Sequence, residues 1–357
     1  MSTLQISLAV AGGLVLAGVV AHSAWSTRKN LPKQATPREP APEPSPTPGA
    51  AQSQDTDALT ERQEPSFDTD SGLQGLTQLT VPDRKAGLDI LIDAMASVAL
   101  ESVVSGEAAL AAMPNTRRVG SKPFGVEGLS VITGEWEFPT AGHRYSAFQC
   151  GVQLANRTGA LNQIEYSEFV ITTQAFADAL DGQAEFPEMQ DEVARARELD
   201  QFASAHDARL SFTLRARHTA WSPGYVQQSA ASLGFVMGAI PGRMVLPANQ
   251  QGHAPILGLS FDSQAAMAED PEQTALRELT LSLDVPQVLR TEQPFVRLCE
   301  LAIALASSMD GVIIDDNGNF IRPEAMEGIH ADLEKLYDTL DGRDLSAGSV
   351  LGRRLFS

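Results

Sequence analysis

The stretch LTLSLDV at 279–285 alternates aliphatic and polar residues, which is the period of a β-strand that buries one face. Residues 210–215 and 257–261 alternate in the same way. Three such strands predict an antiparallel sheet that is covered on one side and open to solvent on the other. The fold class indicated is therefore α+β.

Two segments with apolar residues at helical spacing are expected to cover this sheet. They span 294–308 and 324–340, and Pro323 stands at the start of the second, where a missing N–H costs nothing. The apolar stripes consist of Phe295, Leu298, Ala302 and Leu305, and of Met326, Ile329, Leu333, Leu336 and Leu340.

The folded region shows a weak internal duplication. Strand and helix patterns between Phe148 and Phe212 follow the same order as those between Ala254 and Asp315, at a spacing of about 103 to 110 residues. We therefore predict two tandem split β-α-β units at 85–207 and 208–340, each with helices on one face of its sheet. The only cysteines, Cys150 and Cys299, fall on inward positions, so we expect buried, reduced thiols.

The N-terminal segment has the properties of a membrane anchor. From Leu4 to Ala24 the chain contains no acid, Lys or Arg, and this length matches a bilayer core. Basic residues follow the segment and none precedes it, which predicts a periplasmic N-terminus and cytoplasmic domains. We assign 1–25 as a single-pass inner-membrane anchor. The alternative is a signal peptide cleaved near 21–23.

Small residues recur every four positions in this segment, at Ala9, Gly13, Ala17 and Ala21. Such a stripe allows two membrane helices to approach closely, so dimerisation through the anchor is one interpretation, and chance occurrence of common small residues is the other.

A spacer and a tail complete the organisation. Residues 26–84 carry proline at nearly every second position between 37 and 48 and continue as a polar, acidic run, which predicts an extended, disordered linker. Residues 341–357 are small and polar with a basic, apolar end, and we expect a flexible tail there.

Composition and motifs argue against several functions. A formal net charge of −19 disfavours a nucleic-acid partner. The sequence contains no phosphate-binding loop, dinucleotide motif, zinc-protease motif or nucleophile elbow, and its histidines lack ligand spacing. Asp315 and Asp316 fit a hairpin turn better than an acid–base pair. We therefore expect no enzymatic activity, small-molecule substrate, metal or cofactor.

From about Ala208 to Leu340 the chain resembles the ZipA family of bacterial cell-division proteins. The residues that carry the resemblance are LSFTLRAR, AASLGFVMG, PILGLSF, LTLSLDVP and IALASSMDGVIIDDNGNFIRPEAMEGIHADL. The resemblance implies a domain that binds the C-terminal tail of FtsZ on the open face of its sheet and holds the division ring, or septum machinery, at the inner membrane. The unit at 85–207 has no counterpart in the short form of the family.

Strand parity and the resemblance together identify candidate partner-binding residues on the second sheet. They are Arg209, Ser211, Thr213, Arg215, Arg217, Ile240, Ser260, Asp262 and Ser282. Three of them are arginines on one side of an acidic protein, which favours either an acidic tail or simple solvation of a free face. The alternative function is a membrane-tethered scaffold of the same fold whose groove has a different protein partner, with the first unit as the binding module or as a second interface.

Overall fold

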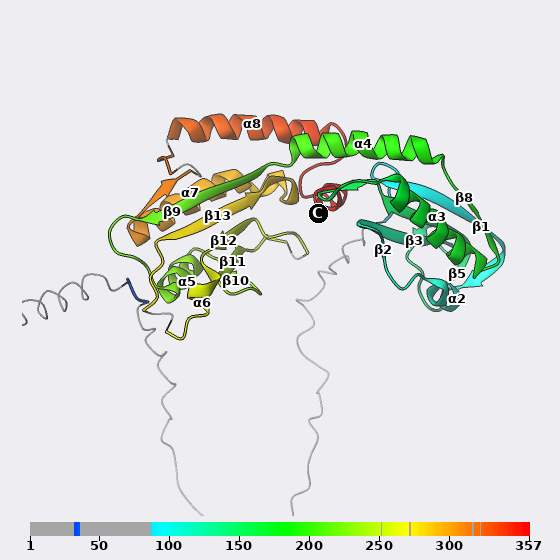
Figure 1. The fold of residues 1–357 in the computed structure, drawn as a ribbon, viewed down its shortest axis with the longest axis horizontal. Coiled ribbons are helices and arrows are strands. Elements are labelled where there is room, and N and C mark those ends of the chain that lie inside the picture. The colour runs from blue at the N-terminus through cyan, green and yellow to red at the C-terminus, as the bar shows by residue number, and fades with distance from the viewer. Residues whose placement is uncertain (1–31, 36–86, 251, 271–272, 316–317, 322) are drawn as a thin grey trace, which may run out of the picture. The chain divides into compact units, whose positions relative to one another are not determined.

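Two antiparallel sheets and their helices form an α+β fold (Figure 1). The structure is a computed structural model that describes residues 32–35, 87–250, 252–270, 273–315, 318–321 and 323–357. The proposed membrane span at 4–24 and most of the proline-rich linker lie outside these residues. Among the helices that are described, none is both long and apolar enough to cross a membrane.

The first sheet has the strand order β2-β3-β5-β1-β8, with β4 paired to β3. Its strands are β1 (Asp93–Ser105), β2 (Arg118–Val119), β3 (Lys122–Ser130), β4 (Trp136–Glu137), β5 (Arg144–Gln153) and β8 (Gly182–Glu185). Its helices are α2 (Gly106–Ala112), α3 (Gln163–Asp178) and α4 (Met189–His206). A small hairpin, β6 (Ala155–Asn156) and β7 (Gly159–Ala160), precedes α3. We call this assembly the first unit.

The second sheet has the order β10-β11-β12-β13-β9-β14. Its strands are β9 (Arg209–Ala216), β10 (Val236–Met237), β11 (Arg243–Leu246), β12 (Leu257–Ser260), β13 (Glu278–Asp284) and β14 (Gly311–Ile314). Its helices are α5 (Pro223–Ser232), α6 (Ser263–Ala266), α7 (Pro294–Met309) and α8 (Pro323–Asp341), and two 3-10 turns, Val285–Gln287 and Arg290–Glu292, precede α7. We call this assembly the second unit.

The two sheets share a core order. In the first unit it is β3-β5-β1-β8 and in the second β12-β13-β9-β14, so β1 corresponds to β9 and α3 to α7. This correspondence differs from the expected spacing, which had matched α4 with α7. The connecting loops have different lengths in the two units. Sequence periodicity alone therefore aligned α7 with α4, the helix that follows its true counterpart α3.

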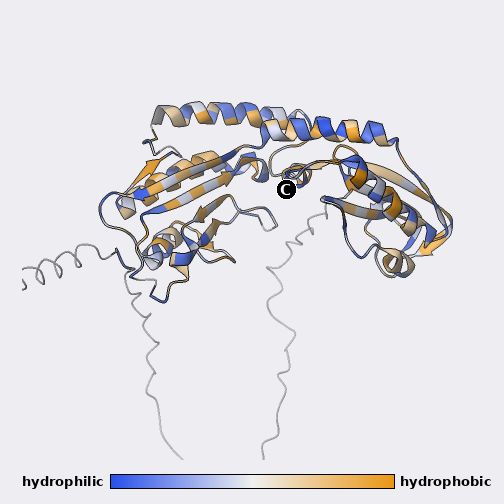
Figure 2. Ribbon diagram, viewed as in Figure 1, coloured by the Kyte–Doolittle hydropathy of each residue, from blue (hydrophilic) through white to orange (hydrophobic). Residues whose placement is uncertain are grey.

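Alternation in the second sheet agrees with the prediction. Leu279, Leu281 and Leu283 of β13 are buried, and so are Phe212 and Leu214 of β9. All four stripe residues of α7 are buried as well, and α7 packs against β9, β13 and β14. Hydrophilic and hydrophobic residues both occur along α8 (Figure 2), whose Leu333 and Leu340 face the core.

The two cysteines are free, as expected, but their environments differ. Cys150 on β5 is fully buried, and burial raises the pKa of its thiol to about 12. Cys299 on α7 is only partly buried, and partial burial raises its thiol pKa to about 11. The expectation of two fully buried thiols therefore holds for the first unit alone.

The residues after α8 differ from the expected flexible tail. They fold back and end in α9 (Val350–Leu355), with Leu355 and Phe356 essentially inaccessible to solvent. We call residues 345–357 the C-terminal segment. Its apolar residues belong to the hydrophobic core, and this burial orders a stretch whose composition alone suggested a flexible tail.

The C-terminal segment bonds to both units, which belong to one compact body. On the first unit, Arg354 pairs with Asp93 at 2.6 Å. On the second unit, Gln287 donates its side-chain N–H to the carbonyl of Phe356 at 2.7 Å, and the Gly348 N–H donates to the carbonyl of Pro286 at 2.9 Å. The segment therefore joins the two sheets.

Candidate functional site

On one face of the second sheet, alternate residues of β9, β12 and β13 are polar or glycine and are partly or fully exposed among the described residues; we call this the open face. The register aligns its outward residues in two rows across three strands. The rows are Gly258, Ser282 and Ser211, and Ser260, Thr280 and Thr213. Four of these six are predicted site residues, so the structure brings Ser211, Thr213, Ser260 and Ser282 together as the sequence indicated.

The residues in the middle of the open face have small side chains. A methyl group at Gly258 would meet the Ser282 hydroxyl at 2.7 Å, so this position admits only glycine without a shift of its neighbour. The other five positions of the two rows are serine and threonine, whose short side chains leave the sheet backbone close to the surface, and we call the six positions together the trough.

Aliphatic residues border one side of the trough. Val245 of β11 lies beside Gly258, and Val236 of the edge strand β10 lies beside Val245. The turn between β10 and β11 carries Ile240, and Val236, Met237 and Ile240 are each about half exposed. The predicted residue Ile240 thus belongs to an apolar border that sequence reasoning had identified only in part.

Charged residues lie on β9 and β13 at both ends of the trough, and they are paired. Arg215 bonds to Glu278 at 2.6 Å, and Arg209 lies 3.7 Å from Asp284. Register aligns each arginine with its acid across β9 and β13. These carboxylates compensate the arginine charges, which the sequence had left open to either an acidic tail or simple solvation of a free face. Parity along 278–284 was the signal that could have found the acids.

Two predicted residues lie outside the trough. Asp262 follows the end of β12, and its carboxylate caps α6 by accepting the Gln264 N–H at 2.9 Å. Arg217 is exposed beyond the end of β9, where its backbone N–H donates to the carbonyl of Asp310. Periodicity continued the strands past their true ends at both positions.

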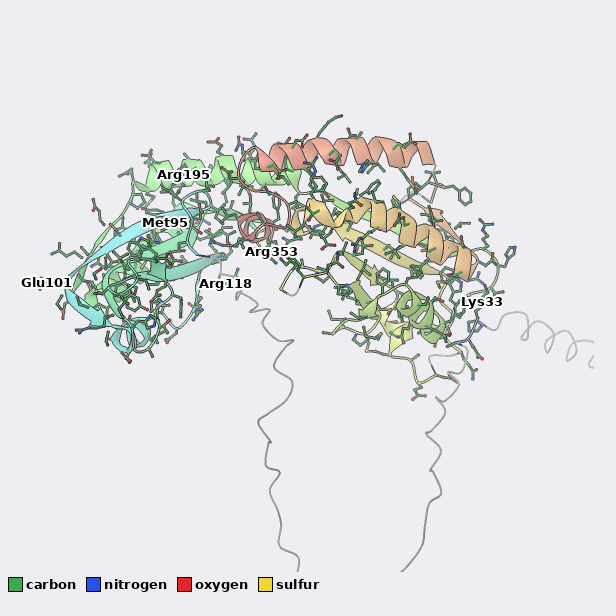
Figure 3. The ribbon with its side chains drawn as sticks, turned by 180° about the vertical axis from the view of Figure 1, so that it is seen from behind. Lys33, Met95, Glu101, Arg118, Arg195 and Arg353 are labelled. Atoms are coloured by element: carbon green, nitrogen blue, oxygen red, sulfur yellow. The ribbon has the colours of Figure 1, made fainter. Side chains whose placement is uncertain are left out.

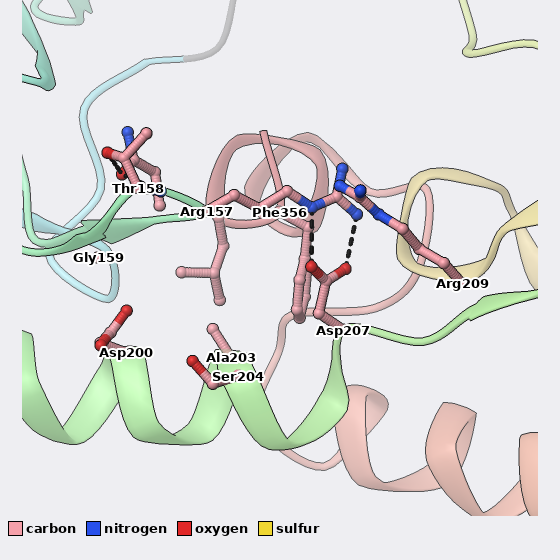
Figure 4. A pocket seen from close by; sticks show the side chains of 11 residues that line it. Arg157, Thr158, Gly159, Asp200, Ala203, Ser204, Asp207, Arg209 and Phe356 are labelled. Carbon is pink, nitrogen blue, oxygen red and sulfur yellow. Dashed lines mark hydrogen bonds and ion pairs between the residues drawn. The ribbon is translucent and has the colours of Figure 1, made fainter.

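An ionic network joins the first unit to one end of the open face. Arg157, in the β6–β7 turn, donates to Asp207 at 2.9 and 2.6 Å (Figure 4). It also donates to Asp284 at 2.6 Å. Burial acts to lower the pKa of Arg157, but the hydrogen bonds to the two carboxylates outweigh it and raise that pKa.

Beside this network is a pocket of about 420 Å³ with a mainly polar lining. It is lined by Asn156, Arg157, Thr158, Gly159, Asp200, Ala203, Ser204, Asp207, Arg209, Leu355 and Phe356. Lys122, buried in the first unit, supports the turn by donating to Asn156 at 2.8 Å and to the carbonyl of Gly159. Sequence reasoning missed this arrangement because its members come from distant segments.

The outward face of the first sheet is differently built. It holds a pocket of about 340 Å³ whose lining includes the side chains of Met95, Trp136 and Phe186 together with Ser97, Gln149 and Glu185. Leu88 packs over Gly125 and Gly151 on the same sheet. Large apolar side chains thus occupy this face, where the second sheet has serine and threonine.

Within the described residues, no group of three or more histidine, cysteine, aspartate or glutamate side chains is placed to hold a metal ion. A comparison of the chain with protein-family models gives no match, and neither does a comparison with curated protein sequences.

Proposed function

We propose that this chain is a non-enzymatic, membrane-anchored cell-division protein whose second unit binds the C-terminal tail of FtsZ and tethers the division ring to the inner membrane. The observation that carries the proposal is the trough of small residues on the open face, bordered by Val236, Val245 and Ile240. The resemblance to the ZipA family and the apolar segment from Leu4 to Ala24 support it. In this proposal the N-terminus is periplasmic and both units are cytoplasmic.

The geometry of the trough favours a weak single contact. A short peptide on a shallow face reaches about micromolar affinity, or about −8 kcal/mol. A filament that displays many tails raises the effective affinity by about 10² or more through avidity. Weak individual contacts therefore suit a protein that follows a polymer that assembles and disassembles.

The test is a titration of the full-length protein in lipid nanodiscs with a fluorescent peptide of the FtsZ tail. We expect saturable micromolar binding that Ser282→Glu weakens at least tenfold, because a carboxylate then fills the trough. Ser97→Glu places the same charge on the first sheet and serves as the matched control, with no change expected. Absence of binding up to millimolar peptide would sink the proposal.

The second candidate function is a membrane-tethered scaffold of the same fold with a different protein partner. The specific observation that favours it is the apolar pocket around Trp136 on the first sheet, since aromatic residues are enriched at protein–protein interfaces. It predicts that FtsZ filaments do not sediment the protein, and that Ser97→Glu, not Ser282→Glu, abolishes capture of an inner-membrane or division partner.

A further inference from the structure

Four residues from the N-terminal part of the chain, Pro32–Ala35, lie against the second unit; we call them the docking segment (Figure 3). Lys33 forms a parallel bridge with Trp221. Its N–H donates to the carbonyl of Ala220 at 2.7 Å, and its carbonyl accepts the N–H of Ser222 at 2.9 Å. Both backbone groups of Lys33 are therefore satisfied by one short stretch of the second unit.

The docking segment adds a second β-bridge to Trp221. Trp221 pairs on its other side with Leu276, with two hydrogen bonds of 2.8 Å. Without Lys33, one edge of this two-stranded ladder would present a buried N–H and C=O without these partners, which is the arrangement that β-strand addition satisfies. Pro32 is buried in the same contact.

Side chains add specificity to the backbone pairing. The Lys33 ammonium donates to the carbonyl of Met309 at 3.1 Å, and the indole N–H of Trp221 donates to the same oxygen at 2.8 Å. Met309 is the last residue of α7, where helix carbonyls lack partners and favour a cation. The Lys33 ammonium also lies 5.8 Å from the centre of the Tyr225 ring.

We propose that the docking segment sets the length of the membrane tether by holding the second unit close to the bilayer. This inference rests on the proposed function in one respect, namely that residues 4–24 cross the membrane. Eight residue steps lead from Ala24 to Pro32, which span at most about 28 Å when fully extended. The docked second unit is thus confined near the membrane surface.

Release of the docking segment changes the reach of the protein. The path from the membrane to the folded units then runs from Ala24 to Gly87, 63 residue steps, with a span of roughly 45 Å as a flexible coil and roughly 200 Å as a polyproline helix. In the docked form, residues 36–86 connect the docking segment to the first unit and do not separate the second unit from the membrane. The tether therefore has a short and a long state.

Hydrogen–deuterium exchange of the full-length protein tests the contact itself. In the wild-type chain we expect the amides of Lys33 and Ser222 to exchange at least tenfold more slowly than those of an unstructured chain. Lys33→Glu puts a carboxylate against the Met309 carbonyl and should remove this protection at both sites. Lys29→Glu makes the same charge change outside the docking segment and should leave the protection intact.

Energy transfer in nanodiscs tests the tether length. A donor dye at Glu327→Cys, in a Cys299→Ala background, and acceptor-labelled lipid headgroups report the height of the second unit above the bilayer. We expect transfer efficiency to fall in Lys33→Glu and to stay at the wild-type value in Lys29→Glu.

Two results would overturn the inference: unprotected exchange at Lys33 in the wild-type chain, or equal transfer in wild-type and Lys33→Glu. Titration of the same variants with the FtsZ tail peptide keeps the outcomes separate. Lys33 lies away from the trough residues, so loss of docking leaves peptide binding unchanged, and failure of peptide binding leaves the exchange result standing.

Discussion

The two units have the same order of core strands, but the outward faces of their sheets differ in chemistry. In the first unit the outward face carries Met95, Trp136 and Leu88, whereas the corresponding face of the second unit carries glycine, serine and threonine. The inward faces, by contrast, are apolar in both. Topology constrains the inward face because it must pack against helices, while the outward face is free to take the chemistry of a partner.

The corresponding helices α3 and α7 are also stabilised differently. Asn162 and Glu165 form a capping box at the start of α3, in which each side chain accepts a backbone N–H of the other residue. At the start of α7 the N-cap is Gln293 in a left-handed conformation, with no side-chain cap. Burial of its apolar stripe holds α7 in place. We therefore expect α7 to depend on apolar packing alone, whereas α3 also depends on its side-chain cap.

Thiol reactivity should separate the two units most strongly. Cys150 is buried and reacts only when the first unit opens, whereas Cys299 is partly accessible, so we expect alkylation rates that differ by roughly 10²-fold at pH 8. Because the thiolate is the reactive form, the rate at Cys299 should rise with pH up to its pKa of about 11. Mass spectrometry of peptides alkylated over time measures both rates, and equal rates would show that the first unit opens freely.

Phe356→Ala should weaken the connection between the units. Truncation of a fully buried aromatic side chain costs about 3–5 kcal/mol of unfolding free energy, and here the cavity lies in the segment that joins both sheets. Urea unfolding followed by alkylation of Cys150 and Cys299 measures the loss in each unit. Phe320, which is 71% exposed, provides the control, since Phe320→Ala should change stability by less than about 0.5 kcal/mol.

Arg157→Ala should cost about 1–3 kcal/mol, because it removes the ion pair of the partly buried Asp207 carboxylate and leaves Asp284 only the longer contact with Arg209. Arg215→Ala removes an ion pair that is half exposed on the open face and should cost less than about 1 kcal/mol. Thermal unfolding of the two variants compares them directly. A larger loss in Arg215→Ala would contradict the assignment of Arg157 as the contact that joins the units.

Asn162→Ala should have the smallest effect, about 1 kcal/mol, through loss of the cap of α3. The corresponding change in the second unit, Gln293→Ala, removes no side-chain hydrogen bond to the helix and should alter stability by less than about 0.5 kcal/mol. Chemical denaturation distinguishes the two. Equal losses of unfolding free energy in the two variants would indicate that the side-chain cap does not stabilise α3 more than α7.

Periodicity predicted the second unit well because its elements bury one face each. Leucines at alternate positions of 279–285 and apolar residues at helical spacing in 294–308 leave few alternatives. Parity then placed Ser211, Thr213, Ser260 and Ser282 on one face without knowledge of the register. The pairing of Arg215 with Glu278 additionally requires the alignment of β9 with β13, which local sequence does not contain.

Contacts between distant segments could not be predicted in this way. Pro32–Ala35 has no periodic pattern, and its bonds depend on an edge near Trp221 that exists only after the second sheet has formed. The C-terminal segment is similar, since Leu355 and Phe356 bury against surfaces from both units. In each case the short stretch has little structural preference of its own and takes its conformation from the partner surface.

The position of the C-terminal segment has a consequence for biosynthesis. Residues 345–357 follow both sheets in the sequence, so a ribosome delivers the strands and helices of the two units before the segment that joins them. Domains fold largely in the order in which they emerge, and each unit must therefore remain soluble for a time without its neighbour. Asp93 of the first unit and Gln287 of the second unit therefore acquire their partners in the C-terminal segment only after both sheets have been synthesised.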